Sequence, residues 1–228
     1  FNEQDWTVRH ELLFELSLEL AECDFLCGRF DAAEQGIDAL LRRAASTIEQ
    51  VAIYRLKLAL HVMKGENPQG VDSGLACLRL LGIDMPAQPS AEQVRAEYDL
   101  IWHNLGGRPF ECILDLPLLS DPEKCAGIEM LDALISAANF VDPNLFCMLT
   151  YRIVNLSLRQ GVTGASTFAY AIFGATLGLF HHRYAEGFRF CQVSCDLADK
   201  HEFTFYKARC RMALGNSTVA TQPLGASI

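Results

Sequence analysis

A glycine-centred break between two amphipathic stretches constrains the fold of this chain more than any other feature. The break reads Gly28-Arg29-Phe30-Asp31-Ala32-Ala33-Glu34. Before it, from about His10, apolar residues recur every three or four positions, at Leu13, Leu16, Leu20, Cys23 and Cys27. After it, the same spacing returns at Ala33, Ile37, Leu40 and Leu41. This spacing is typical of helices with one buried face. Because glycine ends helices and small residues let helices touch, the sequence predicts an antiparallel helical hairpin with its turn at Gly28.

A second hairpin follows, with a weaker pattern. Ser46 and Glu49 form a predicted capping box for a helix that runs to about Lys64, and Gly65 ends that helix. Gly65 follows Gly28 at close to the ~34-residue period of tetratricopeptide repeats. Asn67 and Gly70 stand at the positions that Phe30 and Ala33 occupy in the first hairpin.

A third hairpin is predicted near the C-terminal end. Its first helix covers 168–180 and contains Gly174 and Gly178, whose spacing favours close helix contact. Its second helix begins at Tyr184, which takes the place of Phe30, and Gly187 takes the place of Ala33. We therefore expect an all-α fold, a right-handed solenoid of antiparallel helix hairpins of the tetratricopeptide type.

Prolines and paired glycines predict where this array is interrupted. Two prolines within 84–89 exclude a continuous helix there, and Gly106-Gly107 ends the next helix. Asp121-Pro122 and Asp142-Pro143 each combine a capping carboxylate with proline at the first helical position, which predicts two helix starts. The predicted units are hairpin repeats at 1–83, a connector with one helix at 84–120, further helical repeats at 121–215 and an irregular tail at 216–228.

The composition excludes several classes of function. The net charge of −9 argues against a nucleic-acid-binding surface. Nine cysteines without CxxC pairs indicate a reducing, cytoplasmic location. The longest nearly uncharged run, Thr167 to Phe180, is shorter than the ~20 residues that span a bilayer. The absence of a signal peptide and of an initial Met suggests a segment cut from a longer chain.

Candidate chemistry is sparse. The chain has no phosphate-binding loop, no nucleophile elbow and no HExxH metal motif, so we expect neither catalysis nor a cofactor. His181, His182, Cys191 and Cys195 form a weak candidate zinc site. The alternative is that both cysteines pack in the core as small apolar residues, which their helical spacing favours.

Several phrases together resemble one family of proteins. They are Leu20-Ala21-Glu22-Cys23, Leu78-Arg79-Leu80-Leu81-Gly82, Glu97-Tyr98-Asp99-Leu100-Ile101-Trp102, Leu114-Asp115-Leu116-Pro117 and Tyr184-Ala185-Glu186-Gly187-Phe188. The chain resembles, over about residues 6 to 214, the helical region of large bacterial signalling proteins. Those proteins join a serine/threonine-kinase-like domain, a STAND-type ATPase, tetratricopeptide-like repeats, a GAF domain and a sensor histidine kinase. The resemblance implies that this segment couples catalytic modules and carries no ATP-binding or phosphoacceptor residue of its own.

The functional hypothesis is a non-catalytic scaffold that relays signals through its concave face or its nearly uncharged middle, Cys125 to His182. Its expected partners are flanking domains of a parent chain or another protein, with no nucleic acid, no membrane and a possible homo-oligomer. The alternative is a sensor that binds a small apolar effector among Phe168, Tyr170, Phe173 and Phe180. The residues expected to pack the repeats are Leu20, Ala21, Gly28, Phe30, Ala33, Gly65, Gly174, Gly178, Tyr184 and Gly187.

Overall fold

The computed structural model describes residues 3–221, and within them the chain folds into helices, with one isolated β-bridge between Leu118 and Val162. The all-α prediction is confirmed. The helices are α1 (Glu3–Val8), α2 (His10–Leu26), α3 (Phe30–Leu41), α4 (Thr47–Met63), α5 (Asn67–Leu80), α6 (Ala91–Leu105), the 3-10 helix η1 (Phe110–Asp115), α7 (Pro122–Val141), α8 (Pro143–Gln160), α9 (Gly164–His181), α10 (Tyr184–Lys200) and α11 (Thr204–Thr221).

Side chains cap the helices where the sequence predicts starts. The Asp121 carboxylate accepts hydrogen bonds from the backbone N–H groups of Glu123 and Lys124. The Asp142 carboxylate accepts one from the N–H of Asn144 at 2.8 Å. The three bonds satisfy donors that the first helical turn leaves free, so both predicted starts are confirmed.

Glycines end α2, α4 and α5. Gly28, Gly65 and Gly82 adopt φ values of 75°, 76° and 69°, a left-handed conformation that side chains disfavour. Gly28 and Gly65 reverse the chain within the two hairpins. α2 therefore packs against α3, and α4 packs against α5.

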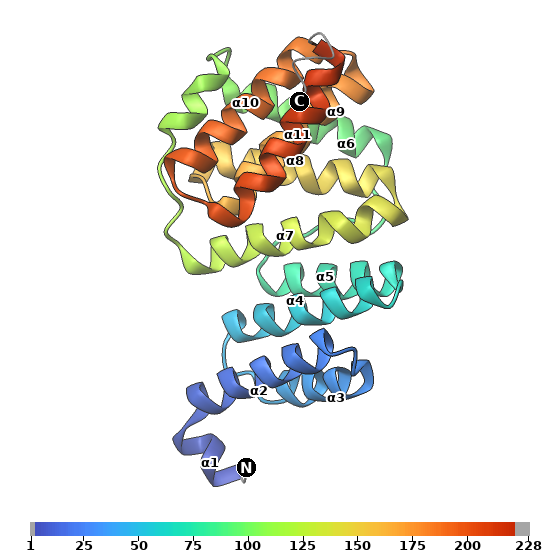
Figure 1. Cartoon of the computed structure of the whole chain (residues 1–228), viewed down its shortest axis with the longest axis vertical. Coiled ribbons are helices and arrows are strands. Elements are labelled where there is room, and N and C mark those ends of the chain that lie inside the picture. Colours follow the sequence, from blue (N-terminus) through green and yellow to red (C-terminus); the bar gives the residue numbers. More distant parts are fainter. Residues whose placement is uncertain (1–2, 222–228) are drawn as a thin grey trace.

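The helices are stacked along the longest axis of the molecule (Figure 1). The N-terminal hairpins lie at one end, and α9, α10 and α11 lie at the other. α7 contacts both α5 and α8, and it thereby connects the two ends.

Two main hydrophobic clusters hold the stack together. The smaller is formed by α2, α3 and α4, and includes Phe14, Ile37 and Ile53. The larger extends from α4 to α10 and includes Leu134, Tyr151 and Phe173. Because α4 contributes to both clusters, it joins the N-terminal hairpin to the rest of the molecule.

The nearly uncharged middle of the chain is core. The side chains of α8 and α9 are mostly buried, and they are covered by other helices of the same chain, α6, α7, α10 and α11. The hypothesis that this stretch binds a partner is therefore wrong for most of its residues, since the stack itself removes them from solvent.

The predicted irregular tail is partly helical. α11 continues through Gly215 to Thr221, so the prediction is wrong for 216–221, and 222–228 lie outside the described residues. The helix tolerates Gly215 because α11 packs on α9 and α10, and tertiary packing outweighs the low helix propensity of one glycine. The connector at 84–120 contains α6 and η1, and α6 packs against α8.

Candidate interaction surface

Four predicted packing residues meet between α9 and α10. A Cβ atom placed on Gly174 would lie 2.5 Å from the carbonyl oxygen of Gly187, and one on Gly187 would collide with the carbonyl of Gly174. The Tyr184 ring lies over Gly178, where a Cβ would be 3.2 Å from its nearest atom. The two helix backbones thus touch at positions where only glycine fits.

The first hairpin uses a different small residue at its contact. Ala21 and Ala33 are buried as expected, and Phe30 is half-buried against Phe25. The close approach of α2 and α3, however, occurs at Gly36, where a Cβ would be 3.2 Å from the Cβ of Ala21. The sequence prediction did not include Gly36 among the packing residues. The signal that could have identified it was a small residue on the side of α3 that faces α2.

Gly28 and Gly65 do not pack against other residues. A Cβ on either would have no described neighbour within 4 Å. Their role is the left-handed turn, so the prediction that they pack the repeats is wrong, while the prediction that they end helices is confirmed.

The predicted buried face of α2 is also wrong in part. Leu20 is 62% exposed and Leu16 is 49% exposed, and Cys23 and Cys27 are exposed as well. The helix instead buries Leu13, Phe14 and Ala21. α2 carries apolar residues on two faces, and spacing alone does not show which of them meets the core.

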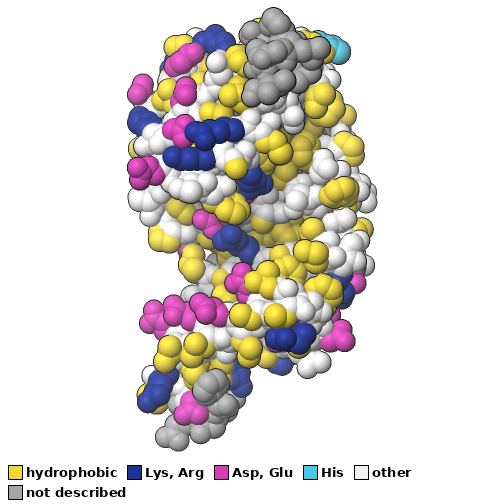
Figure 2. All heavy atoms as spheres, viewed as in Figure 1, with side chains coloured by type: hydrophobic (Ala, Val, Ile, Leu, Met, Phe, Trp, Pro, Cys, Tyr) yellow, Lys and Arg dark blue, Asp and Glu magenta, His cyan; other side chains and the backbone are white. Residues whose placement is uncertain are grey.

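The second apolar face of α2 forms a stripe along the helix, which we call the leucine stripe. Its members, which are all exposed, are Leu12, Leu16, Leu20, Cys23 and Cys27. Val8 and Leu26, at the two ends, are 74% and 72% exposed. Figure 2 shows yellow apolar side chains at this end of the molecule beside a group of acidic ones.

A groove between α2 and α3 continues this apolar surface. It has a volume of about 320 Å³, and Leu20 forms part of its wall. Most of its lining is small, with Ser17 and Ala21 from α2 and Ala32, Gly36 and Ala39 from α3. Small side chains leave room for another backbone to approach closely.

A row of glutamates follows the other edge of the leucine stripe. Its members, at spacings of three or four, are Glu11, Glu15, Glu19 and Glu22, and all are exposed. The opposite side of the groove carries Arg42 and Arg43, and the Arg43 guanidinium lies 4.7 Å from the centre of the Trp6 ring. The surface is therefore apolar along its centre and strongly acidic on one side.

The candidate zinc site does not assemble. The His181 ring stacks on Tyr98 at 4.2 Å between ring centres, whereas the buried Cys191 thiol points to the carbonyl of Ala171 at 3.4 Å. Burial raises the pKa of Cys191 to about 11 and that of Cys195 to about 12, which disfavours the thiolate that zinc requires. Within residues 3–221 no three His, Cys, Asp or Glu side chains are placed to share a metal ion.

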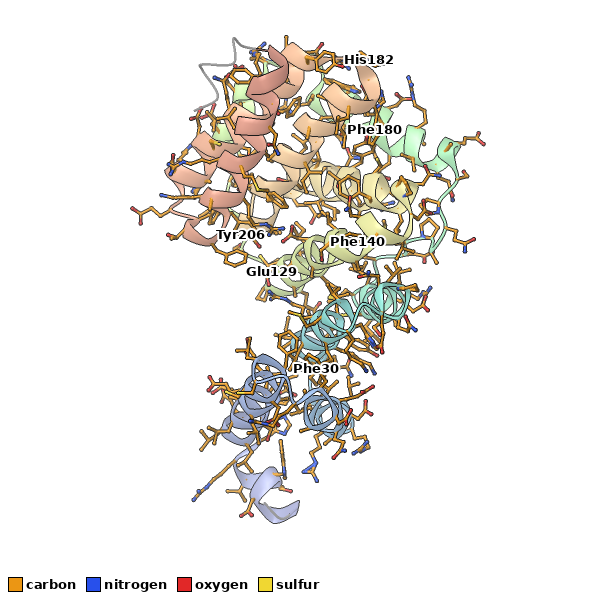
Figure 3. The ribbon with its side chains drawn as sticks, turned by 45° about the vertical axis from the view of Figure 1, so that its right-hand side comes forward. Phe30, Glu129, Phe140, Phe180, His182 and Tyr206 are labelled. Atoms are coloured by element: carbon orange, nitrogen blue, oxygen red, sulfur yellow. The ribbon has the colours of Figure 1, made fainter. Side chains whose placement is uncertain are left out.

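The predicted effector-binding residues do not surround one cavity. Tyr170 and Phe173 are fully buried, and Phe173 packs edge-on against Tyr151 and Phe190. Phe180 instead lies near the surface, 54% exposed (Figure 3). Tyr170 and Phe173 are therefore part of the core.

Phe180 lines a separate hollow of about 250 Å³ at the ends of α6, α8 and α9. Tyr98, Tyr151 and His181 form its aromatic wall. The Tyr98 hydroxyl accepts a hydrogen bond of 2.9 Å from Arg183, which fixes the ring. No sequence signal placed Tyr98 and His181 together, because they are distant in the chain.

The geometry defines the chain as an all-helical protein with an exposed apolar face and, among its described residues, no assembled metal site. Comparison with curated proteins shows similarity to the hybrid signal transduction histidine kinase G of Dictyostelium discoideum, at 19% identity over 217 residues. The match covers 86% of this chain and 6% of that protein. No family model matches the chain, and no solved structure gives a significant match.

The relative is a eukaryotic protein, whereas the resemblance was to bacterial ones. The Dictyostelium relative is a signal transduction histidine kinase by name. The bacterial proteins that the sequence resembles also include a sensor histidine kinase. Across the described helices, none has the length and apolar character needed to cross a bilayer.

Proposed function

We propose that this chain is a non-catalytic interaction region of a larger signalling protein, and that the leucine stripe of α2 is where it contacts another domain or protein. The stripe is the observation that carries the proposal. An exposed apolar surface of this length is costly in water unless a partner covers it. Terminal repeats of helical arrays otherwise have polar outer faces, whereas α2 exposes the leucine stripe beside its glutamates.

The proposal also includes the repeat architecture of the chain. We infer a tetratricopeptide-like, right-handed solenoid at the N-terminal end, because the α2–α3 and α4–α5 hairpins follow one another at close to the repeat period. The name of the Dictyostelium relative supports a role in signal transduction. In this proposal the kinase and ATPase activities belong to other domains of a cytoplasmic parent protein.

Site-specific crosslinking tests the proposal. A photo-reactive amino acid placed at Leu16 in the native cell is expected to give a discrete adduct with one protein or one domain. The matched control is Leu80, which is 51% exposed against 49% for Leu16 but lies on α5. If position 16 gave no adduct above that of position 80, α2 would not be an interaction surface.

A second candidate function is the binding of a small apolar effector in the hollow beside Phe180. Its aromatic wall, Tyr98, Tyr151 and His181, favours this candidate. Small aromatic compounds can be screened by thermal shift. A compound that binds in the hollow is expected to raise the unfolding temperature of the wild type and to leave that of a Phe180→Ala variant unchanged. A hit that stabilised both proteins equally would bind elsewhere.

A further inference from the structure

The chemistry of the partner can be read from the charges beside the leucine stripe, if the stripe is the interaction surface proposed above. Between His10 and Leu26, α2 contains five acidic residues and no Lys or Arg. Asp24 is paired with Arg29 at 2.7 Å. The other four acids are the glutamate row, and they lack ion-pair partners within the described part of the chain.

Several acidic residues elsewhere in the molecule are paired with cations, whereas among residues 3–221 the four members of this row are not. Glu129 is bonded to Arg55 at 2.7 Å, and Asp199 to Lys207 and Arg211. In the row, Glu11, Glu15 and Glu19 are four residues apart, a spacing at which like charges repel along a helix. Cations opposite the row would remove that repulsion.

The shape of the surface fits a helix. The leucine stripe runs the length of α2, and the adjacent groove is lined by the small residues Ala21, Ala32 and Gly36. A second helix laid along α2 would place apolar side chains between the stripe and the groove, and its backbone could come close to α3. The side of the second helix that faces away from the groove would then lie opposite the glutamate row.

We propose that this surface binds an amphipathic helix of a partner protein whose apolar side is flanked by a row of Lys or Arg at three- and four-residue spacing. Apolar contact supplies the affinity, and the charge row sets the orientation and excludes other helices.

The same charges argue against other occupants. In an antiparallel pairing of α2 with the α2 of a second copy, the glutamate row of one chain would face that of the other. Anionic lipid surfaces and nucleic acids would be repelled by the row and by the net charge of −9. A basic helix is the occupant that both the apolar stripe and the charges accept.

Binding of designed peptides to the 228-residue chain tests the proposal. One fluorescent peptide matches α2 in length and carries a leucine stripe flanked by lysines. A second has glutamate at each lysine position, and a third has the composition of the first in scrambled order. We expect the lysine peptide to bind at least about tenfold more tightly than the other two, with an affinity that falls as salt is added.

Variants of the chain test whether the lysine peptide binds at the leucine stripe. Leu16→Glu with Leu20→Glu is expected to reduce binding of the lysine peptide at least about tenfold, whereas Leu80→Glu leaves it unchanged. Because Leu16 and Leu20 are exposed, the fold is retained, as circular dichroism will show. Leu12→Gln is the milder second variant.

Charge-reversal variants test whether the glutamate row determines the preference for a basic partner. Glu15→Lys with Glu19→Lys is expected to reverse the preference in favour of the glutamate peptide, and the matched reversal Asp72→Lys with Asp196→Lys is expected to leave it unchanged.

Equal binding of the lysine and glutamate peptides, both lost in Leu16→Glu with Leu20→Glu, would overturn the basic partner and leave the interaction surface standing. Binding that no α2 variant affects would overturn both. Light scattering that showed a dimer broken by Leu16→Glu, or binding of the chain to neutral vesicles through the stripe, would replace the partner helix by a second copy or a membrane.

Discussion

At the scale of single residues, glycine has two separate roles in this molecule. At Gly28 and Gly65 it allows a left-handed turn, and a Cβ there would meet no described atom within 4 Å. At Gly174 and Gly187 it allows two backbones to touch. The sequence marks all four positions with the same letter, and only the packed structure separates the two roles.

The contact between α9 and α10 gives a first prediction. Gly187→Ala is expected to lower the free energy of unfolding by about 1–3 kcal/mol, because its Cβ collides with backbone that cannot move freely. Urea denaturation measures this change. Gly215→Ala is the control, since a Cβ there would have no neighbour within 4 Å among the described residues, and it is expected to be neutral or to stabilise α11 by up to ~1 kcal/mol. Equal effects of the two substitutions would show that α9 and α10 are not in close contact.

His181 gives a prediction about pH. Burial is the main cause that lowers its pKa below the ordinary value of 6.5, and the nearby Arg95 and Arg183 add to it, opposed by Asp99. The unfolded chain therefore binds the proton more readily, so the contribution of His181 to stability is fully present above pH 6.5 and is lost as pH falls. Urea midpoints at about pH 7.5 and about pH 5.5 measure the loss. In His181→Gln the loss should be smaller, and an unchanged loss would assign it to other groups.

At the scale of secondary-structure elements, α2 and α11 show how apolar pattern and tertiary contact differ. α2 has two apolar faces, of which Leu13, Phe14 and Ala21 meet the core and the leucine stripe does not. The apolar periodicity of α11 is lost after Gly215, yet the helix packs on both α9 and α10.

α11 is also held to α7 by an ion pair between the half-buried Arg209 and the buried Asp132. Arg209 donates a hydrogen bond of 3.2 Å to the Asp132 carboxylate, and the Tyr206 hydroxyl lies 3.5 Å from the same oxygen. Burial raises the pKa of Asp132, and the Arg209 charge opposes that shift. The carboxylate thus depends on Arg209 to stay ionised.

Removal of this cation gives the third prediction. Arg209→Met is expected to destabilise the protein by about 3 kcal/mol near neutral pH, because it leaves a buried carboxylate unpaired. The cost should shrink as pH falls and Asp132 becomes protonated. Arg211→Met, at the exposed pair with Asp199, is expected to cost ~0–1 kcal/mol. Denaturation across pH measures both, and the double variant Asp132→Asn with Arg209→Met should recover part of the loss.

At the scale of the whole molecule, the stack has a small core at one end and a large one at the other. α2 contributes three buried residues, whereas α8 contributes eleven. α4 is shared by both clusters. The end that carries the proposed interaction surface is therefore the less tightly packed one.

This asymmetry gives the fourth prediction. Amides of α2 and α3 are expected to exchange with deuterium more than about tenfold faster than those of α8 and α9, after correction for intrinsic rates, because local opening exposes less apolar surface there. Exchange measured by mass spectrometry on peptides from each helix provides the comparison. Uniform protection from α2 to α10 would mean that the two cores unfold as one unit.

Much of the fold could be predicted from the residues themselves. Capping side chains such as Asp121 and Asp142 and the turn at Gly28 act through neighbours a few positions away, so local sequence contains the whole signal. A contact such as that of Tyr98 with His181 joins distant positions and left no pattern to detect.

The sequence by itself determined that this protein is helical, where helices such as α7 and α8 begin, and that α2 is apolar at Leu16 and Leu20. Only the tertiary structure decided that these leucines face water while the nearly uncharged α8 and α9 lie inside. The physical reason is that periodicity fixes the side of a helix on which a residue lies, whereas burial depends on which other helices cover that side.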